Sequence, residues 1–382
     1  MKLGIFIMAA GALLVQAAVC ATGQKDTGPP VIVGYVFPRG AVLKPGQIDA
    51  RNLDRINYAF ANTKDGQVTA GGPADAQNLA TLIALKKEKP SLQILISIGG
   101  WSGSQDFSDI ALTAQSREIF TDSVMQFVRG NHLDGADVDW EYPGQSGAGH
   151  RYRAKDKQNF TLLLKDLRQR FNQEQHASGR RFYLTIAAGA SDDYLANTEM
   201  AAVAQAVDAV NLMAYDYNEG VSTGRTTHQA PLYINPHAPV SESVDASVLA
   251  FERAGVPAAK LILGVPFYAR SWQQVGGVDH GLFQAGKPAA RDFIPFAEIN
   301  NSMIGHGFTR YWDSAAAAPY LYSESQKIFV SYDDPESLGQ KCSYVLAHHL
   351  GGVMFWEYSD DPTGTLTNAI AHALDPSVPA PH

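Results

Sequence analysis

The chain has 382 residues and a formal net charge of −8, with 45% hydrophobic and 18% charged residues. The net negative charge argues against a protein that binds nucleic acid or an anionic membrane surface, and it favours a neutral or cationic ligand. The length exceeds that of an average domain, although barrels of alternating strands and helices use such a length as one unit.

The first predicted element is a leader. Residues 1–21 read MKLGIFIMAAGALLVQAAVCA, in which one lysine precedes an apolar and small stretch, as in secretory signal peptides. We exclude these residues from the fold and expect a secreted protein, extracellular or periplasmic. The alternatives are a membrane anchor, for which the stretch is short, and a lipid attached at Cys20. Cleavage after Ala21 leaves Cys342 as the one cysteine, so no disulfide framework is expected.

Eight short apolar runs bounded by glycine, proline or polar residues predict β-strands. They are rich in β-branched and aromatic residues and almost continuously apolar, which is typical of strands buried on both faces. In chain order the runs are 31–37, 55–62, 93–101, 133–140, 181–189, 209–216, 261–269 and 351–358.

Amphipathic stretches between the runs predict helices, of which the clearest are 77–89, 114–130, 156–176, 244–255 and 335–350. Strand and helix alternate, which predicts the α/β class, and the count of eight predicts a closed (β/α)8 TIM barrel. An open doubly wound sheet is the alternative.

The barrel is expected to form one domain over residues 30–375. A long segment rich in glycine and aromatic residues separates the last two strands, and we expect 271–332 to form a small inserted α+β lobe. Residues 376–382 are rich in proline and are expected to form a disordered tail.

Three acidic residues alternate along the fourth predicted strand, where 133–144 read LDGADVDWEYPG. Because side chains alternate along a strand, Asp137, Asp139 and Glu141 share one face, with successive members about 6.5 to 7 Å apart. In a barrel the inward face is the core, so acids there need solvent, hydrogen bonds or a ligand, and chemistry takes place at the C-terminal mouth. Glu141 should lie nearest that mouth.

Like charges this close disfavour simultaneous ionisation, so the three acids should hold at least one proton near neutral pH and titrate together. Glu141 can then deliver a proton to a glycosidic oxygen while another group stabilises an oxocarbenium-like centre. The alternatives are a calcium or magnesium site and a solvated edge strand. Val138 and Trp140, which look like strand residues packing outward, disfavour both.

Residues 134–141, DGADVDWE, closely resemble the signature of glycoside hydrolase family 18, the chitinase family, usually written Asp-Gly-x-x-Asp-x-Asp-x-Glu. Three further segments resemble motifs of that family in the same order: SIGG at 97–100, MAYDYN at 213–218 and GGVMFWEYSDD at 351–361. GVPFYARSW at 264–272 resembles its seventh strand, after which many members carry an α+β insertion. The resemblance covers essentially the whole mature chain and is to the bacterial type.

The resemblance implies a retaining chitinase that works by substrate assistance. The substrate's own 2-acetamido oxygen attacks the anomeric carbon and forms an oxazolinium intermediate, so no protein nucleophile, metal or cofactor is expected. By matching motif, Glu141 is the acid and then the base, Asp139 holds the acetamido group, and Asp137 shares a proton with Asp139. Tyr215 would donate to the acetamido oxygen, a role that suits an unionised phenol.

Asp216 and Arg270 are also expected to contact the sugar. In a regular strand Asp216 cannot share a face with Tyr215, so its role requires the strand to end or bulge there. For Ser97 two interpretations stay open: a hydrogen bond to Asp137 from below, or a small residue chosen for packing.

Several aromatic residues fall at or just beyond the C-terminal ends of predicted strands, where their faces stack on sugars or fill the core. Trp140 faces away from the acids and is expected in the core. Trp356 shares a face with Met354 and, by resemblance, forms the floor beneath the cleaved sugar. The expected sugar contacts are Tyr35, Phe60, Ser97, Trp101, Met213 as part of the wall, Asp216, Tyr268, Arg270 and Trp356.

The predicted substrate is chitin or a chito-oligosaccharide, cleaved at β-1,4 linkages between N-acetylglucosamine units by a monomer without stable membrane insertion. An endo-β-N-acetylglucosaminidase acting on N-linked glycans and a non-catalytic chitin-binding lectin are the alternatives. A metal-dependent phosphodiesterase is disfavoured, because His132, His228, His348 and His349 do not form a ligand set at strand ends.

Overall fold

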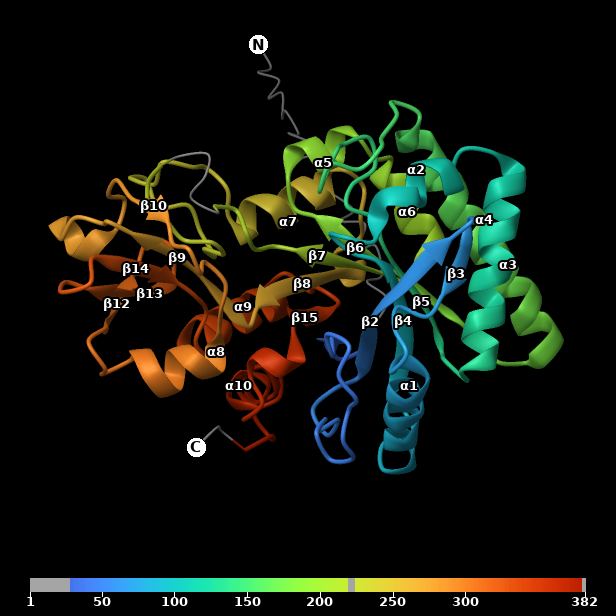
Figure 1. Cartoon of the computed structure of the whole chain (residues 1–382), viewed down its shortest axis with the longest axis horizontal. Helices are drawn as coiled ribbons and strands as arrows, with labels where there is room; N and C mark the ends of the chain where they lie inside the picture. Colours follow the sequence, from blue (N-terminus) through green and yellow to red (C-terminus); the bar gives the residue numbers. More distant parts are fainter. Residues whose placement is uncertain (1–27, 219–223, 380–382) are drawn as a thin grey trace, which may run out of the picture.

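The computed structural model describes residues 28–218 and 224–379. Within these ranges nine strands form a large sheet surrounded by helices, and six strands form the sheet of a smaller lobe beside it (Figure 1). The expected leader 1–21, with Cys20, lies outside the described residues. In the described ranges, no helix combines the length and apolar character that a membrane span requires.

The large sheet closes into a barrel, because β1 pairs with β2 on one side and with β15 on the other. All pairings around the ring are parallel, as expected when a crossover connection follows each strand. The ring consists of β1 (Val31–Val36), β2 (Arg55–Lys64), β4 (Gln93–Gly99), β5 (Gly135–Asp139), β6 (Tyr183–Gly189), β7 (Ala209–Met213), β8 (Leu261–Pro266) and β15 (Gly352–Trp356). The predicted TIM barrel is therefore confirmed, and the open sheet is wrong. The ninth strand, β3 (Gln67–Thr69), forms a hairpin with β2.

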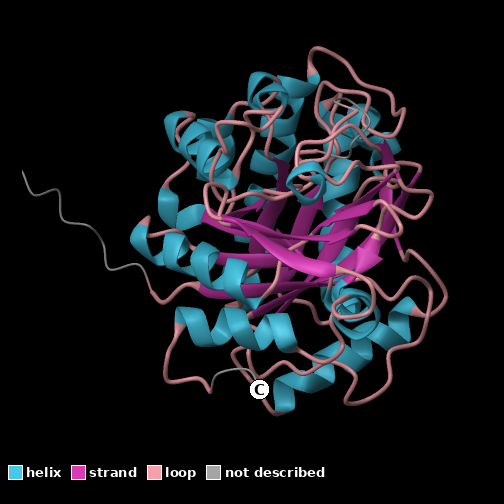
Figure 2. Ribbon diagram, turned by 90° about the vertical axis from the view of Figure 1, so that its left-hand side faces the viewer, coloured by secondary structure: helices cyan, strands magenta, loops and turns pink. Residues whose placement is uncertain are grey.

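Helices occupy the connections and surround the ring of strands (Figure 2). Thr113 and Asp334 cap the first turns of α3 and α9 by accepting backbone N–H groups, and Pro335 occupies the first position of α9. The helices of the barrel are α1 (Asp75–Ala84), α2 (Phe107–Ile110), α3 (Ala114–Gly130), α4 (Asp156–Ser178), α5 (Asp192–Ala196), α6 (Met200–Ala206), α7 (Val244–Arg253), α9 (Pro335–Ala347) and α10 (Thr365–Leu374). Short turns are η1 (Leu85–Lys87), η2 (Ser104–Asp106), η3 (Ala258–Lys260) and η6 (Tyr358–Asp360).

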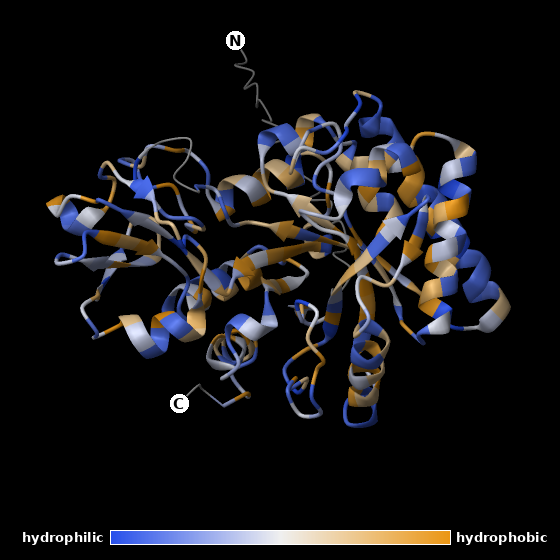
Figure 3. Cartoon of the chain, in the orientation of Figure 1, coloured by the Kyte–Doolittle hydropathy of each residue, from blue (hydrophilic) through white to orange (hydrophobic). Residues whose placement is uncertain are grey.

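Side-chain alternation along β5 separates two environments. Ala136 and Val138 belong to the large apolar core that includes residues of the surrounding helices, whereas Asp137 is paired in register with Ser97 and Thr185 of the neighbouring strands. Figure 3 shows the corresponding pattern, with predominantly apolar barrel strands and helices that carry both apolar and polar faces. The inward face is thus the place where β5 can present acids.

The lobe sheet is antiparallel, in the order β10-β9-β14-β13-β12, with β11 also paired to β9. Trp272, Tyr320, Tyr322 and Phe329 pack into a core of its own. Its elements are β9 (Tyr268–Gln273), η4 (Val278–Gly281), β10 (Lys287–Pro288), β11 (Ile294–Pro295), α8 (Phe296–Glu298), the π-helical turn η5 (Ile299–Met303), β12 (Thr309–Asp313), β13 (Ala318–Ser323) and β14 (Ile328–Ser331).

The predicted strand 261–269 is two strands in the structure. β8 ends in the barrel at Pro266, and β9 begins in the lobe at Tyr268. Phe267 between them donates its backbone N–H to the carbonyl oxygen of Trp356 at 2.8 Å and is buried. The lobe sheet therefore begins before residue 271.

The C-terminal end of the described chain packs on the barrel. Of the expected tail 376–382, residues 376–379 are described. Val378 packs against the main core, and its carbonyl oxygen lies 2.6 Å from His372 Nδ1.

Candidate active site

Three acids of the β5 segment lie in a column toward the barrel mouth. Their exposed fractions rise along the chain, from 0% for Asp137 through 3% for Asp139 to 8% for Glu141. Beyond the end of β5, the backbone N–H of Glu141 donates to Ser104 Oγ at 2.9 Å, and this hydroxyl lies 3.0 Å from the carbonyl oxygen of Asp139. The Ser104 clamp therefore holds Glu141 in place just after the strand, at the mouth.

Asp137 accepts hydrogen bonds from four strands. Tyr35 Oη and Ser97 Oγ donate to its Oδ2, each at 2.8 Å. Thr185 Oγ1 and Asn211 Nδ2 donate to its Oδ1, at 2.6 and 3.1 Å. Burial raises the pKa of Asp137, while the hydrogen bonds from Thr185, Tyr35 and Ser97 lower it. Because four donors meet its two oxygens, the arrangement suits a carboxylate that needs no further partner.

This set of donors settles one open interpretation and adds two residues. Ser97 is a hydrogen-bond donor to Asp137 as well as a small packed residue. Thr185 and Asn211 were not among the expected site residues. Side-chain alternation, applied to the fifth and sixth strands of the ring, could have found both: Thr185 is in register with Asp137, and Asn211 lies on the same face of β7 two residues beyond Ala209, the partner of Thr185.

Asp139 and Glu141 lack such saturation. Burial raises the pKa of Asp139 well above its ordinary range, and the charges of Glu141 and then Asp137 add to this effect. Its Oδ1 is buried and accepts no hydrogen bond from the described residues. Burial also raises the pKa of Glu141 to about 7, with Asp216 acting in the same direction and a hydrogen bond from Tyr142 opposing it. Asp139 is therefore affected more by Glu141 than by Asp137, the partner expected to share its proton.

The chain turns sharply after β7, which answers the difficulty with Asp216. β7 ends at Met213, and Asp216 has a φ of 58°, in the left-handed region. Asp216 accepts hydrogen bonds from Tyr268 Oη at 2.7 Å and from Arg270 Nε and Nη2 at 2.7 and 2.8 Å. Burial raises the pKa of Tyr215 well above its ordinary range, and the charges of Asp139 and Asp216 add to it, so its hydroxyl stays a donor.

Aromatic rings form a platform at the end of β15, across the barrel from the acids. Trp356 lies 5.6 Å from Phe60, in a stacked arrangement, and 5.7 Å from both Tyr35 and Phe37, measured between ring centroids. Met213 belongs to the same cluster as a partly buried wall residue. Phe37 was not among the expected contacts, although it lies on the same face as Tyr35.

Three other tryptophans divide between surface and core. Trp101 is 54% exposed and lies 6.4 Å from Tyr142, edge to face. Trp140 is buried and stacks on Phe107 at 5.4 Å, so it is a core residue as expected. Trp272 is buried inside the lobe.

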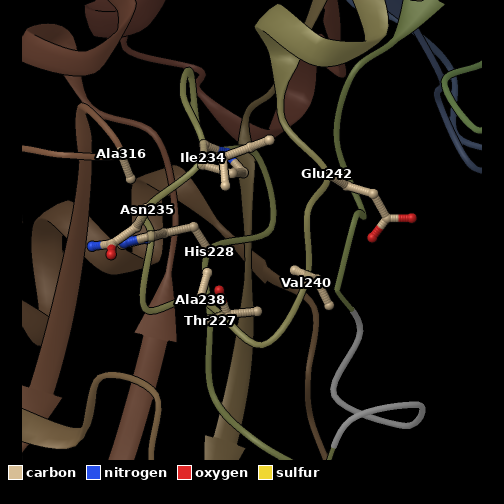
Figure 4. A pocket seen from close by; sticks show the side chains of 9 residues that line it. Thr227, His228, Ile234, Asn235, Ala238, Val240, Glu242 and Ala316 are labelled. Atoms are coloured by element: carbon tan, nitrogen blue, oxygen red, sulfur yellow. The ribbon is translucent and has the colours of Figure 1, made fainter.

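A small cavity lies away from the acids, between the segment that follows β7 and the lobe (Figure 4). It measures about 10 Å³, enough for one water molecule, and the buried His228 lines it. His228 Nε2 lies 3.1 Å from Asp313 Oδ2, which connects this segment to β12. In the described ranges, no group of three or more His, Cys, Asp or Glu side chains is arranged to hold a metal ion.

Comparison with known proteins identifies the family of this barrel. The sequence profile described as "Glycosyl hydrolases family 18" matches residues 31–361. Chitinase A1 of Niallia circulans is 42% identical over 323 residues, which cover 80% of this chain and 46% of that protein. Chitotriosidase-1 of Mus musculus is 33% identical over 341 residues, covering 85% and 70%. The chain thus spans about half the length of Chitinase A1.

Solved structures agree in fold and in family. A glycoside hydrolase family 18 N-acetylglucosaminidase from Paenibacillus barengoltzii superposes with a TM-score of 0.83 at 41% identity, covering 90% of this chain and 99% of that one. Chitinase ChiA74 from Bacillus thuringiensis gives a TM-score of 0.86 at 31% identity, covering 93% and 70%.

Proposed function

This chain belongs to glycoside hydrolase family 18, and we propose that it hydrolyses β-1,4 linkages between N-acetylglucosamine units in chitin or chito-oligosaccharides. The family retains the anomeric configuration through substrate assistance, so the protein must provide an acid and hold the acetamido group. Glu141 can provide the acid, and Asp139 with Tyr215 can hold the acetamido group.

In the first step Glu141 acts as the acid. With a pKa of about 7, it is largely protonated in mildly acidic solution and can give its proton to the glycosidic oxygen as the bond to the anomeric carbon breaks. The acetamido oxygen of the same sugar bonds to that carbon and forms an oxazolinium ion. The acetamido N–H finds its acceptor in Asp139 Oδ1, the buried oxygen that accepts no hydrogen bond from the described residues.

In the second step Glu141 acts as the base. Its carboxylate takes a proton from a water molecule, whose oxygen bonds to the anomeric carbon on the face from which the aglycone left. The oxazolinium ring opens and the acetamido group is restored. Tyr215, as a phenol, donates a hydrogen bond to the acetamido oxygen before the attack and after the ring opens. The aromatic platform that includes Trp356 packs against the apolar face of the sugar.

One observation carries this proposal: a buried acceptor on Asp139 stands between a saturated carboxylate, Asp137, and an acid whose pKa is about 7, Glu141. The test is incubation of purified protein with a chitin hexamer, followed by separation of the product anomers. We expect β-anomers to appear first. If neither chitin nor its oligomers yield any product, the proposal fails, and initial α-anomers contradict the mechanism.

Release of single sugars is a second candidate activity. The structure from Paenibacillus barengoltzii, named an N-acetylglucosaminidase, is 41% identical and matches 99% of its own length. Steady release of N-acetylglucosamine from chitobiose supports this activity, and a chitobiose that stays intact contradicts it.

We also propose that the chain is exported and acts as a monomer. The apolar leader at 1–21 supports export. N-terminal sequencing of protein collected outside the cytoplasm should show cleavage after Ala21, and a retained leader contradicts it. Light scattering on the mature protein should give the mass of one chain.

A further inference from the structure

Three separate loops meet at Arg39, beside the aromatic platform. Arg39 follows β1, and its Nη2 lies 3.1 Å from Glu357 Oε1 and 3.6 Å from Asp360 Oδ1, both just after β15. Its guanidinium carbon lies 5.4 Å from the ring centroid of Phe37 and 5.8 Å from that of Phe293, which belongs to the lobe. Arg39 therefore joins the first loop of the barrel to the last and to the lobe.

The partners of Arg39 are fixed on each side. Glu357 has a side chain that is 1% exposed, and besides Arg39 it accepts hydrogen bonds from the backbone N–H of Phe37 at 3.4 Å and of Ser359 at 3.0 Å. On the lobe side Phe293 stacks on Tyr268, with centroids 4.3 Å apart. Both oxygens of Glu357 are engaged by the protein, so this acid is not left to bind sugar hydroxyls.

The order of the strands gives the direction of the sugar chain. Around the ring β5 lies opposite β15, with β1 next to β15. Glu141, after β5, must reach the oxygen that leaves, so the sugars of the leaving group extend toward the β4 and β5 loops, where Trp101 and Tyr142 lie. The opposite end of the platform, toward Arg39, then faces the non-reducing end of the chain.

The cluster of Phe37, Arg39 and Phe293 lies close to the aromatic platform. The centroid of Phe37 is 5.7 Å from that of Trp356, and Arg39 packs on the ring of Phe37 itself and on that of Phe293. A sugar chain passing over Trp356 in this direction thus meets Phe37, Arg39 and Phe293 within a short distance.

From this geometry, and resting on the proposed function, we propose that Arg39, held by Glu357 and packed between Phe37 and Phe293, closes the sugar-binding groove on the non-reducing side. The enzyme then accepts chain ends rather than the interior of a chain, and it releases one or two sugars at a time from the non-reducing end. Arg39 acts here on specificity and not on the chemical step.

The test uses a chitin hexamer that carries a fluorescent label at its reducing end. Early in the reaction, release from the non-reducing end leaves a labelled pentamer or tetramer, whereas internal cleavage leaves a labelled trimer or dimer. We expect pentamer and tetramer from the natural protein. In Arg39→Ala and in Phe293→Ala the first labelled products should shift toward trimer and dimer, because either change opens the groove on the non-reducing side.

The control is Arg181→Ala, which removes an exposed arginine paired with Asp208 at 2.9 Å, at the other end of the barrel. Its product pattern should match that of the natural protein. Trimer and dimer as first products of the natural protein overturn the inference, as does an unchanged pattern in both Arg39→Ala and Phe293→Ala. In Phe293→Ala the buried Glu357 and Asp360 keep their ion pairs with Arg39. This variant therefore tests the inference even if Arg39→Ala fails to fold. If no hydrolysis is observed, the proposed function is contradicted, and the inference falls with it. Hydrolysis that gives internal products contradicts the inference alone, so the two failures can be told apart.

Discussion

Asp137 and Asp139 on β5 and Glu141 just beyond its end are all buried, yet their surroundings differ. Asp137 accepts four hydrogen bonds from β1, β4, β6 and β7, whereas Asp139 Oδ1 accepts none from the described residues. Burial therefore does not distinguish these acids, and the supply of donors does. An acid saturated by the protein stabilises the barrel, and an unsaturated acid at the mouth is available to a ligand.

The largest effect should follow from Glu141→Gln, which keeps the shape and removes the transferable proton. We expect kcat on a chitin oligomer to fall about 10³-fold, in the range usual for loss of a general acid, with oligosaccharide binding retained. Single-turnover kinetics and titration calorimetry measure the two quantities. Nearly unchanged turnover would contradict the role of Glu141 as the general acid.

Asp139→Asn should come next, because the amide cannot balance the charge of the oxazolinium ion. We expect kcat to fall about 10²-fold with a smaller change in KM. The matched control is Asp134→Asn, just before β5, which removes ion pairs with Lys86 and Arg180 at 2.6 and 2.9 Å. The control should lose stability and keep kcat. Equal losses of kcat in both variants would contradict a catalytic role for Asp139 that Asp134, before the start of β5, does not share.

The next effect in size should be the dependence of kcat/KM on pH, which reports on the protonation of Glu141. Since Glu141 acts first in its protonated form, kcat/KM should fall above about pH 7, by about tenfold per pH unit. The charge of Asp216 raises the pKa of Glu141, so Asp216→Asn should move this alkaline limb to lower pH. A limb that stays in place or moves upward contradicts the coupling.

The smallest effect should come from loss of a hydrogen bond to Asp137, whose two oxygens are already satisfied by the protein. Thr185→Val removes the 2.6 Å hydrogen bond to Asp137, and we expect the free energy of unfolding to fall by about 1 to 3 kcal/mol. Thr161→Val in α4 is the control, because Thr161 Oγ1 is buried without a hydrogen-bond partner in the described residues. Its stability in urea should stay the same or rise. Equal destabilisation of both variants would show that hydrogen bonding to Asp137 is not the cause.

Strand periodicity was enough to place the acids. Because side chains alternate along a strand, Asp137 and Asp139 had to lie on one face of β5 and Val138 on the other, and Glu141, two residues further and just beyond the strand, continues the column of acids. The eight apolar runs likewise predicted the barrel. Periodicity failed where the backbone leaves the strand: β7 stops at Met213, the left-handed turn at Asp216 follows, and β8 stops at Pro266. Such endings depend on contacts made elsewhere in the fold.

The sequence by itself determined which residues could carry acid chemistry, because that depends on residue type and local spacing. Only the tertiary structure decided which acid is saturated, since Asp137 receives its donors from residues 40 to 102 positions away along the chain. Likewise only closure of the barrel brings Arg39 to Glu357, 318 positions apart. Local periodicity carries no information on pairings of this kind, because they arise when the last strand of the ring meets the first.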